Sequence, residues 1–99
     1  MKLTRTDHGD ETTIVVEGTL DITTAQEFRD MADKVTADNR KKVVLETSAL
    51  HLIDSSGVAV IMSLYKRVQT YEGELTISGL QDQPRQIFRL LRLDKVFSI

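Results

Sequence analysis

Extended patterns alternate with helical patterns along most of this chain, and no other feature of the sequence restricts its possible folds as strongly. Residues 43–45 form an unbroken aliphatic run, which is typical of a central strand covered on both faces. Leu75 and Ile77 alternate with polar residues, as they would in a strand with one buried face. The order predicts an α/β fold, in which helices pack on a mixed sheet of about four to five strands.

The N-terminal part of this pattern predicts a hairpin followed by a helix. Residues 3–5 and 12–17 read as extended pieces, and the turn-rich stretch around Gly9 joins them. Thr24 and Glu27 are spaced as in a capping box, so we expect a helix to begin there. Apolar residues at helical spacing follow them, which predicts that one face of this helix is buried.

Two further helices are predicted in the second half of the chain. Residues 50–53 are apolar and are expected to form a loop, after which residues 54–57 open a strongly apolar helix that ends at Gly73. A third helix is expected to begin at Asp82, and residues 96–97 are expected to add a last extended piece. The apolar side of the third helix is expected to be buried, and consists of Ile87, Phe88, Leu90 and Leu91.

The composition is that of a small globular protein. With 99 residues, the chain has room for one hydrophobic core, so we expect a single domain over residues 1–99. It has no cysteine, which excludes disulfides and thiolate chemistry. The net charge of −2 is too small to direct the protein to nucleic acid or to an acidic membrane. No segment resembles a signal peptide or reaches membrane-spanning length, which favours a cytoplasmic protein without membrane insertion.

The tetrapeptide Asp54-Ser55-Ser56-Gly57 stands where an apolar stretch meets the second predicted helix. A helix start leaves backbone N–H groups unpaired, and Asp or Ser commonly accepts hydrogen bonds from them, so capping alone is one explanation of Ser55. The tetrapeptide is also expected at the carboxyl edge of the sheet, where open α/β folds usually have their sites. We interpret Ser55 as a regulatory residue rather than a catalytic nucleophile.

Other kinds of chemistry find little support in the sequence. A hydrolase needs a base near its serine, and neither His8 in a turn nor His51 in the predicted loop has the spacing of a known triad. There are no paired metal ligands and no glycine-rich phosphate loop, so we predict no enzyme activity, no metal and no cofactor. A basic stripe on the third helix suits a solvated face or a protein partner better than nucleic acid. It consists of Arg85, Arg89, Arg92 and Lys95.

Residues 50–61, with the sequence LHLIDSSGVAVI, resemble the signature of the STAS domain in bacterial anti-sigma factor antagonists. The match extends to residues 17–21 and 73–75, in the order that the family has. The resemblance implies a STAS-like fold in which the helix after the Asp-Ser-Ser-Gly loop is central. It also implies that a serine kinase, which acts as the anti-sigma factor or as part of a partner-switching module, phosphorylates Ser55, and that a PP2C-type phosphatase removes the phosphate.

Further positions take their implied roles from the same resemblance. Asp21 and Asp54 match the acidic residues that flank the phosphorylated one, and Ser56 matches its neighbouring hydroxyl and is the second choice as acceptor. Together with Gly57 they are the implied partner-binding residues. The family usually has an additional helical segment after its last strand, and the stretch up to Ile99 leaves little room for one.

A phosphate on Ser55 is expected to act as a local switch. It adds about −1.5 to −2 charge, which the N-terminus of a helix tolerates well. Beside Asp54, at a surface that meets another protein, this charge is unfavourable, and a loss of ~3 kcal/mol weakens binding roughly a hundredfold. The alternative function is a STAS subunit of a membrane transport system, which docks on its ATPase or permease without a phosphorylation cycle.

Overall fold

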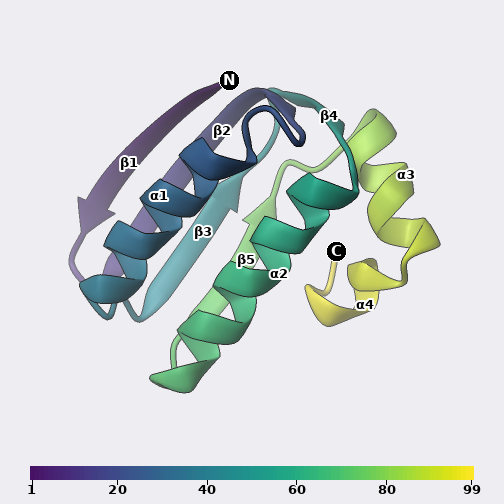
Figure 1. Ribbon diagram of the computed structural model, residues 1–99. Helices are drawn as coiled ribbons and strands as arrows, with labels where there is room; N and C mark the ends of the chain where they lie inside the picture. The colour runs from purple at the N-terminus through teal and green to yellow at the C-terminus, as the bar shows by residue number, and fades with distance from the viewer.

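A five-stranded sheet and four helices make up the structure, a computed structural model that describes residues 1–99 (Figure 1). The strands are β1 (Lys2–His8), β2 (Glu11–Leu20), β3 (Lys42–Glu46), β4 (Leu50–Ile53) and β5 (Glu74–Ser78). The helices are α1 (Ala25–Ala37), α2 (Ser55–Thr70), α3 (Asp82–Leu90) and α4 (Leu93–Val96). The predicted fold class and the predicted number of strands are confirmed.

The strand order is β1-β2-β3-β5, and β4 lies off this path against β2. β1 and β2 form the predicted antiparallel hairpin, and all other pairings are parallel, so the sheet is mixed. β2 pairs with β3 along residues 11–15 and with β4 along residues 18–20. β4 therefore takes over as the neighbour of β2 where β3 ends, and the carboxyl ends of β2 and β4 meet at one edge of the sheet.

The hydrophobic core lies between the sheet and the two long helices, α1 and α2, which cover one face (Figure 1). Alternate strand residues point into this core. Among them are Ile14, Leu45 and Ile77, which lie opposite one another on β2, β3 and β5. Val44 points to the opposite face and is only half-buried, because no helix covers that face. The prediction that residues 43–45 are covered on both faces is therefore wrong, although β3 does lie inside the sheet.

The first helix has the predicted position but not the predicted cap. The hydroxyl of Thr24 donates to the carbonyl of Thr19 at 2.9 Å and accepts from the backbone N of Asp21 at 2.9 Å. Because this hydroxyl is bound to the preceding loop, it makes no capping hydrogen bond to α1. The capping box with Glu27 is therefore a wrong prediction.

Residues 50–53 form strand β4 rather than the predicted loop. Pairing with β2 supplies the hydrogen bonds that make this short segment a strand, and His51 within it is exposed. The following helix α2 is central, as predicted, and it ends at Thr70 instead of Gly73. Its buried residues are Gly57, Val58, Val60, Ile61, Leu64 and Val68.

The C-terminal part differs most from the prediction. Phe88 is buried, but Leu90 and Leu91 are 78% and 54% exposed. Two residues rotate a helix by about 200°, so Leu90 points away from the core that Phe88 enters. The chain then forms α4 instead of an extended piece, and the ring of Phe97 packs edge-on against Tyr65. None of the four helices combines the length and the apolar character that a membrane-spanning helix requires.

Candidate functional site

The Ser55 junction, residues 54–57, lies at the edge where β2 and β4 end (Figure 1). Asp54 is the N-cap of α2, and its Oδ1 accepts from the backbone N of Gly57 at 3.0 Å. Its Oδ2 accepts from the backbone N of Ile22 at 3.2 Å, in the loop between β2 and α1. The backbone N of Asp54 donates to the carbonyl of Leu20 at 3.3 Å. Asp54 therefore starts the helix and ties it to the end of β2.

Gly57 allows α2 to begin directly against the ends of the two strands. A Cβ at this position would lie 2.4 Å from the carbonyl oxygen of Leu20 and 2.6 Å from Cγ1 of Ile53. Both distances are far below van der Waals contact, so a side chain here requires the backbone to move. Gly57 thus shapes the junction and offers no side chain to a partner.

The hydroxyl of Ser55 is exposed and makes no hydrogen bond in the structure, and Ser56 is half-buried with an equally unpaired hydroxyl. Asp54 supplies the cap of α2, so the helix does not need Ser55 for that purpose. Of the two hydroxyls, that of Ser55 is the more accessible to another protein.

Asp21 lies at the same edge, but its carboxylate serves its own loop. Oδ1 accepts from the hydroxyl of Thr23 at 2.6 Å and from the backbone N of Thr23 at 2.9 Å. These bonds, chiefly the one from the hydroxyl, hold the pKa of Asp21 below its usual value. The bond between Ile22 and Asp54 brings this loop to the junction, whereas the carboxylates of Asp21 and Asp54 share no donor.

An apolar hollow of about 230 Å³ lies next to Ser55, between the start of α2 and the helix α3. Its lining residues are Asp54, Ser55, Val58, Ile87, Leu90 and Leu91. On the other side of the junction, the side chain of Ile22 is 75% exposed. The sequence pattern assigned both leucines to the core and contained no signal for Ile22. The third predicted helix has more apolar residues than one side of so short a helix can bury. This excess was the signal in the sequence that some of them are exposed.

The other candidate residues from the sequence do not join this site. His51 is exposed on β4 and His8 ends β1, and neither lines the hollow beside Ser55. Arg85 and Arg89 line a small crevice between α3 and α4, on the other side of α3. No arginine, lysine or histidine lines the hollow, and Asp54 is the one ionisable side chain that lines it.

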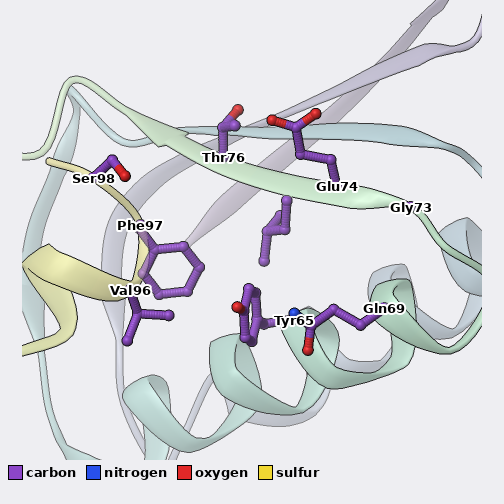
Figure 2. A pocket seen from close by; sticks show the side chains of 9 residues that line it. Tyr65, Gln69, Gly73, Glu74, Thr76, Val96, Phe97 and Ser98 are labelled. Atoms are coloured by element: carbon purple, nitrogen blue, oxygen red, sulfur yellow. The ribbon is translucent and has the colours of Figure 1, made fainter.

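A pocket of about 270 Å³ lies away from the junction, between α2 and β5 (Figure 2). Tyr65 and Gln69 reach it from α2, Glu74 and Thr76 come from β5, and Phe97 lies at one end. Figure 2 shows the carboxylate of Glu74 on the side of β5 that faces away from Tyr65 and Phe97, and no histidine or lysine lines the pocket. No group of three acidic or histidine side chains is placed to hold a metal ion.

Sequence comparison relates the chain to one family. A sequence model described as STAS domain matches residues 2–99. A STAS-domain containing protein of Pseudomonas aeruginosa is 26% identical over 91 residues, which are 92% of this chain and 89% of that protein. The match therefore spans nearly the full length of both.

Three solved structures share the fold. A candidate anti-sigma factor antagonist from Thermotoga maritima has a TM-score of 0.88 at 20% identity, covering 95% of this chain and 81% of that one. An anti-sigma factor antagonist from Mycobacterium paratuberculosis has a TM-score of 0.87 at 24% identity, covering 97% of this chain and 81% of that one. A sulfate transporter family protein from Wolinella succinogenes has a TM-score of 0.77 at 14% identity, covering 91% of this chain and 73% of that one. The match over residues 2–99 and the shared fold show that this chain belongs to the STAS domain family.

Proposed function

We propose that this protein is an anti-sigma factor antagonist, a non-enzymatic cytoplasmic regulator that exchanges protein partners. The unmodified form binds an anti-sigma factor that is also a serine kinase, and phosphorylation of Ser55 releases it. A PP2C-type phosphatase restores the binding form. The observation that carries this proposal is the exposed, unbonded hydroxyl of Ser55, which stands beside an apolar hollow at the start of a helix that another residue caps.

Exposed apolar side chains on both sides of the junction support a binding surface there. Leu90 and Leu91 lie on one side and Ile22 on the other, and all three are more than half exposed. Burying such side chains removes apolar surface from water, which favours association. An apolar side chain of the partner can enter the hollow, as anchor residues do at many interfaces. Ser55 then lies within the surface that the partner covers.

A phosphate at this position opposes binding without opposing the fold. At the N-terminus of α2 the helix dipole stabilises a negative charge. At the covered surface, however, about −1.5 to −2 charge would stand beside Asp54, and no cationic side chain lines the hollow to neutralise it. A loss of ~3 kcal/mol at the interface is enough to weaken binding roughly a hundredfold.

The neighbouring residues support the same site in different ways. Asp54 holds the junction in place and adds a like charge next to the phosphate. Asp21 shapes the loop that presents Ile22. Ser56 is the second choice as acceptor, because its hydroxyl is also free but less accessible.

A docking subunit of a membrane transport system is the second candidate function, with an ATPase or a permease as its partner. The shared fold with a sulfate transporter family protein is compatible with it, and the same exposed apolar side chains would serve such a contact. In that function the hydroxyl of Ser55 has no role. Variants of Ser55 therefore distinguish the two functions.

Partner recovery with Ser55 variants tests the proposal. The wild type, Ser55→Ala and Ser55→Asp are used to recover proteins from the organism that encodes the chain, and the intact mass of each is measured. With the recovered kinase and ATP, we expect the wild type to gain one phosphoryl group and Ser55→Ala to remain bound and unmodified. Ser55→Asp should bind about a hundredfold more weakly. Ser63→Ala, which changes an exposed serine of the same helix, is the matched control.

Each alternative has its own outcome. Equal modification of Ser55→Ala and the wild type would move the acceptor to Ser56. Recovery of the same transporter components by all three forms, with no phosphorylated species, would contradict the proposed function in favour of the second. A phosphorylated form whose circular dichroism or amide shifts change throughout the sheet and helices would contradict a local switch.

A further inference from the structure

The outer edge of β4 is closed by a side chain instead of a strand. β4 pairs with β2 on one side, while β5 pairs with β3 and ends at Ser78. On the other side of β4, the backbone N of Ile53 donates to Oε1 of Gln83 at 2.9 Å. The carbonyl of Ile53 accepts from Nε2 of Gln83 at 2.9 Å. The amide of Gln83 therefore makes the two hydrogen bonds that a neighbouring strand would make.

These bonds hold the residue that immediately precedes the Ser55 junction. The side chain of Ile53 is 2% exposed, and the next residue, Asp54, is bound through its backbone N to Leu20 of β2. The start of α2 is thus held from two sides, by β2 and by Gln83. A backbone group that loses its partner away from water is costly, so without the amide of Gln83 the chain at Ile53 must move or admit water.

Gln83 also belongs to the helix that forms the other wall of the apolar hollow. Gln83 and Ile87 are four residues apart on one side of α3, and Leu91, four residues further on, directly follows the helix. Ile87 and Leu91 line the hollow opposite Ser55, and α3 lies beside β4 (Figure 1). One amide therefore connects the strand that leads to Ser55 with the helix that faces it.

We propose that Gln83 is a positioning residue for the phosphoacceptor, because its amide sets where Ser55 stands relative to the α3 wall of the hollow. An effect of Gln83 on phosphorylation rests on the proposed function, whereas its effect on the position of Ser55 does not. Without the amide, the junction and α3 are expected to separate while the core beneath α1 stays intact. This local effect distinguishes positioning from a general contribution to stability.

Amide hydrogen exchange followed by NMR tests the two hydrogen bonds. In Gln83→Ala the amide of Ile53 should exchange about tenfold faster or more, because it has lost its acceptor. Buried amides of α1, such as that of Val35, should keep their wild-type rates. Gln83→Glu keeps an acceptor for the backbone N of Ile53 but places a carboxylate oxygen against its carbonyl, so it should restore only part of the protection at Ile53. Gln86→Ala removes an exposed glutamine of the same helix that makes no hydrogen bond, and is the matched control.

A distance across the hollow tests the positioning itself. The chain has no cysteine, so nitroxide labels can be attached specifically at Ser55→Cys and Leu90→Cys, two exposed positions. The dipolar broadening of the electron paramagnetic resonance spectrum reports how far apart the labels are. We expect a broader distribution of distances in Gln83→Ala and an unchanged one in Gln86→Ala. An unchanged distribution in Gln83→Ala, or equally faster exchange of all amides, would overturn the proposal.

The kinase recovered with the wild type provides the functional readout. The initial rate of Ser55 phosphorylation should fall about tenfold in Gln83→Ala, because small misplacements of a reacting group slow its reaction strongly, and should not change in Gln86→Ala. A wild-type rate in Gln83→Ala would also overturn the proposal. If no kinase is recovered at all, the proposed function fails, while exchange and label distances still decide whether Gln83 positions Ser55.

Discussion

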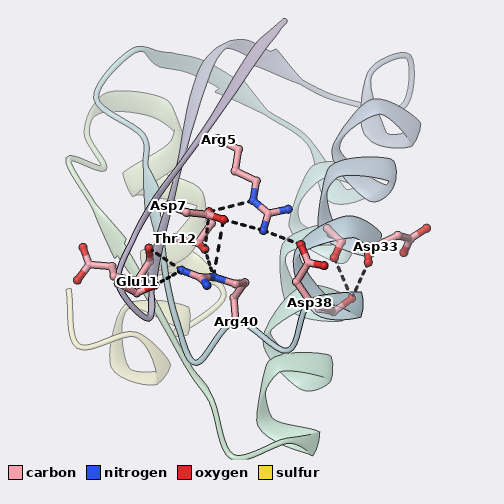
Figure 3. A network of polar contacts seen from close by, with 10 residues as sticks. Arg5, Asp7, Glu11, Thr12, Asp33, Asp38 and Arg40 are labelled. Carbon is pink, nitrogen blue, oxygen red and sulfur yellow. Dashed lines mark hydrogen bonds and ion pairs between the residues drawn. The ribbon is translucent and has the colours of Figure 1, made fainter.

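The two ends of the sheet use their polar groups in different ways. At the end where β1 turns into β2, Arg5 and Arg40 both pair with Asp7 (Figure 3). Thr12, which is fully buried, donates to Asp7 at 2.9 Å and accepts from Nε of Arg40 at 2.7 Å. At the opposite end, no ion pair includes a residue of the Ser55 junction. The carboxylate of Asp54 there accepts hydrogen bonds from the backbone N of Ile22 and of Gly57.

The difference indicates which end is available to a partner. In the ion-pair network, the charges of Arg5, Arg40 and Asp7 are paired within the chain. At the junction the chain leaves the hydroxyl of Ser55 without a partner and the side chains of Ile22 and Leu90 in solvent. Clustered exposed apolar surface marks interaction sites. These features support the interface that is proposed at the junction end.

The largest loss of stability is expected from a substitution of Gly57, where the junction has no space for a side chain. Gly57→Ala should lower the free energy of unfolding by about 2 to 3 kcal/mol, because the new Cβ would overlap the carbonyl of Leu20. Urea unfolding measures this change. Ser55→Ala, two residues earlier and exposed, should stay within about 0.5 kcal/mol of the wild type and is the control. Wild-type stability of Gly57→Ala would mean that the junction is loosely packed.

A smaller loss is expected at the network end, from a single hydroxyl. Thr12→Val keeps the shape of the side chain but removes its bonds to Asp7 and Arg40, which should cost about 1 to 2 kcal/mol in urea unfolding. Thr13→Val makes the same change on the half-buried opposite face, where the hydroxyl makes no hydrogen bond, and should be close to neutral. Equal effects of the two substitutions would show that the network does not stabilise this end.

Removal of the cap at the junction is expected to cost about 1 kcal/mol. Asp54→Ala loses the bonds from the backbone N of Gly57 and of Ile22, and typical N-cap substitutions have this effect. Asp54→Asn keeps an acceptor for Gly57 and should lose less. Asp10→Ala, in the exposed turn between β1 and β2, is the control for loss of a carboxylate. If Asp54→Ala and Asp10→Ala unfold at the same urea concentration, the cap does not hold the junction.

Lowering the pH is expected to show the smallest difference in stability between the two ends of the sheet, because each end has a carboxylate with a lowered pKa. The hydrogen bond from Arg5, followed by that from Thr12, lowers the pKa of Asp7, and the hydroxyl of Thr23 lowers that of Asp21. A carboxylate of this kind stabilises the fold above its unfolded-state pKa of about 4, and the contribution is lost as the pH falls below that value.

The urea midpoint of the wild type should therefore fall between about pH 5 and pH 2, and it should fall less in Asp7→Asn and in Asp21→Asn. The same decrease in the wild type and in both variants would assign the acid sensitivity to other groups. Glu46 is the first to consider, because its bonds from Ser48 also lower its pKa.

Local sequence patterns were sufficient to predict the α/β class, the opening hairpin and the central helix α2, because each depends on residues close together in the chain. The start of α2 at residues 54–57 was predictable at the same level. The residues that resemble the STAS signature led to the family, and the cap of α2 joins Asp54 to Gly57, only three positions away. The proposed role of Ser55 stays a prediction that the variants above test.

The remaining features depend on contacts between residues far apart in the sequence, which local periodicity does not contain. Residues 50–53 are a strand because β2 pairs with them, and Leu90 is exposed because the core reaches only the Phe88 side of α3. Ile22 meets Asp54 across 32 positions, and Gln83 meets Ile53 across 30. The sequence thus led to Ser55 as the proposed phosphoacceptor, whereas the hollow beside it and the hydrogen bonds between Gln83 and Ile53 result from tertiary packing.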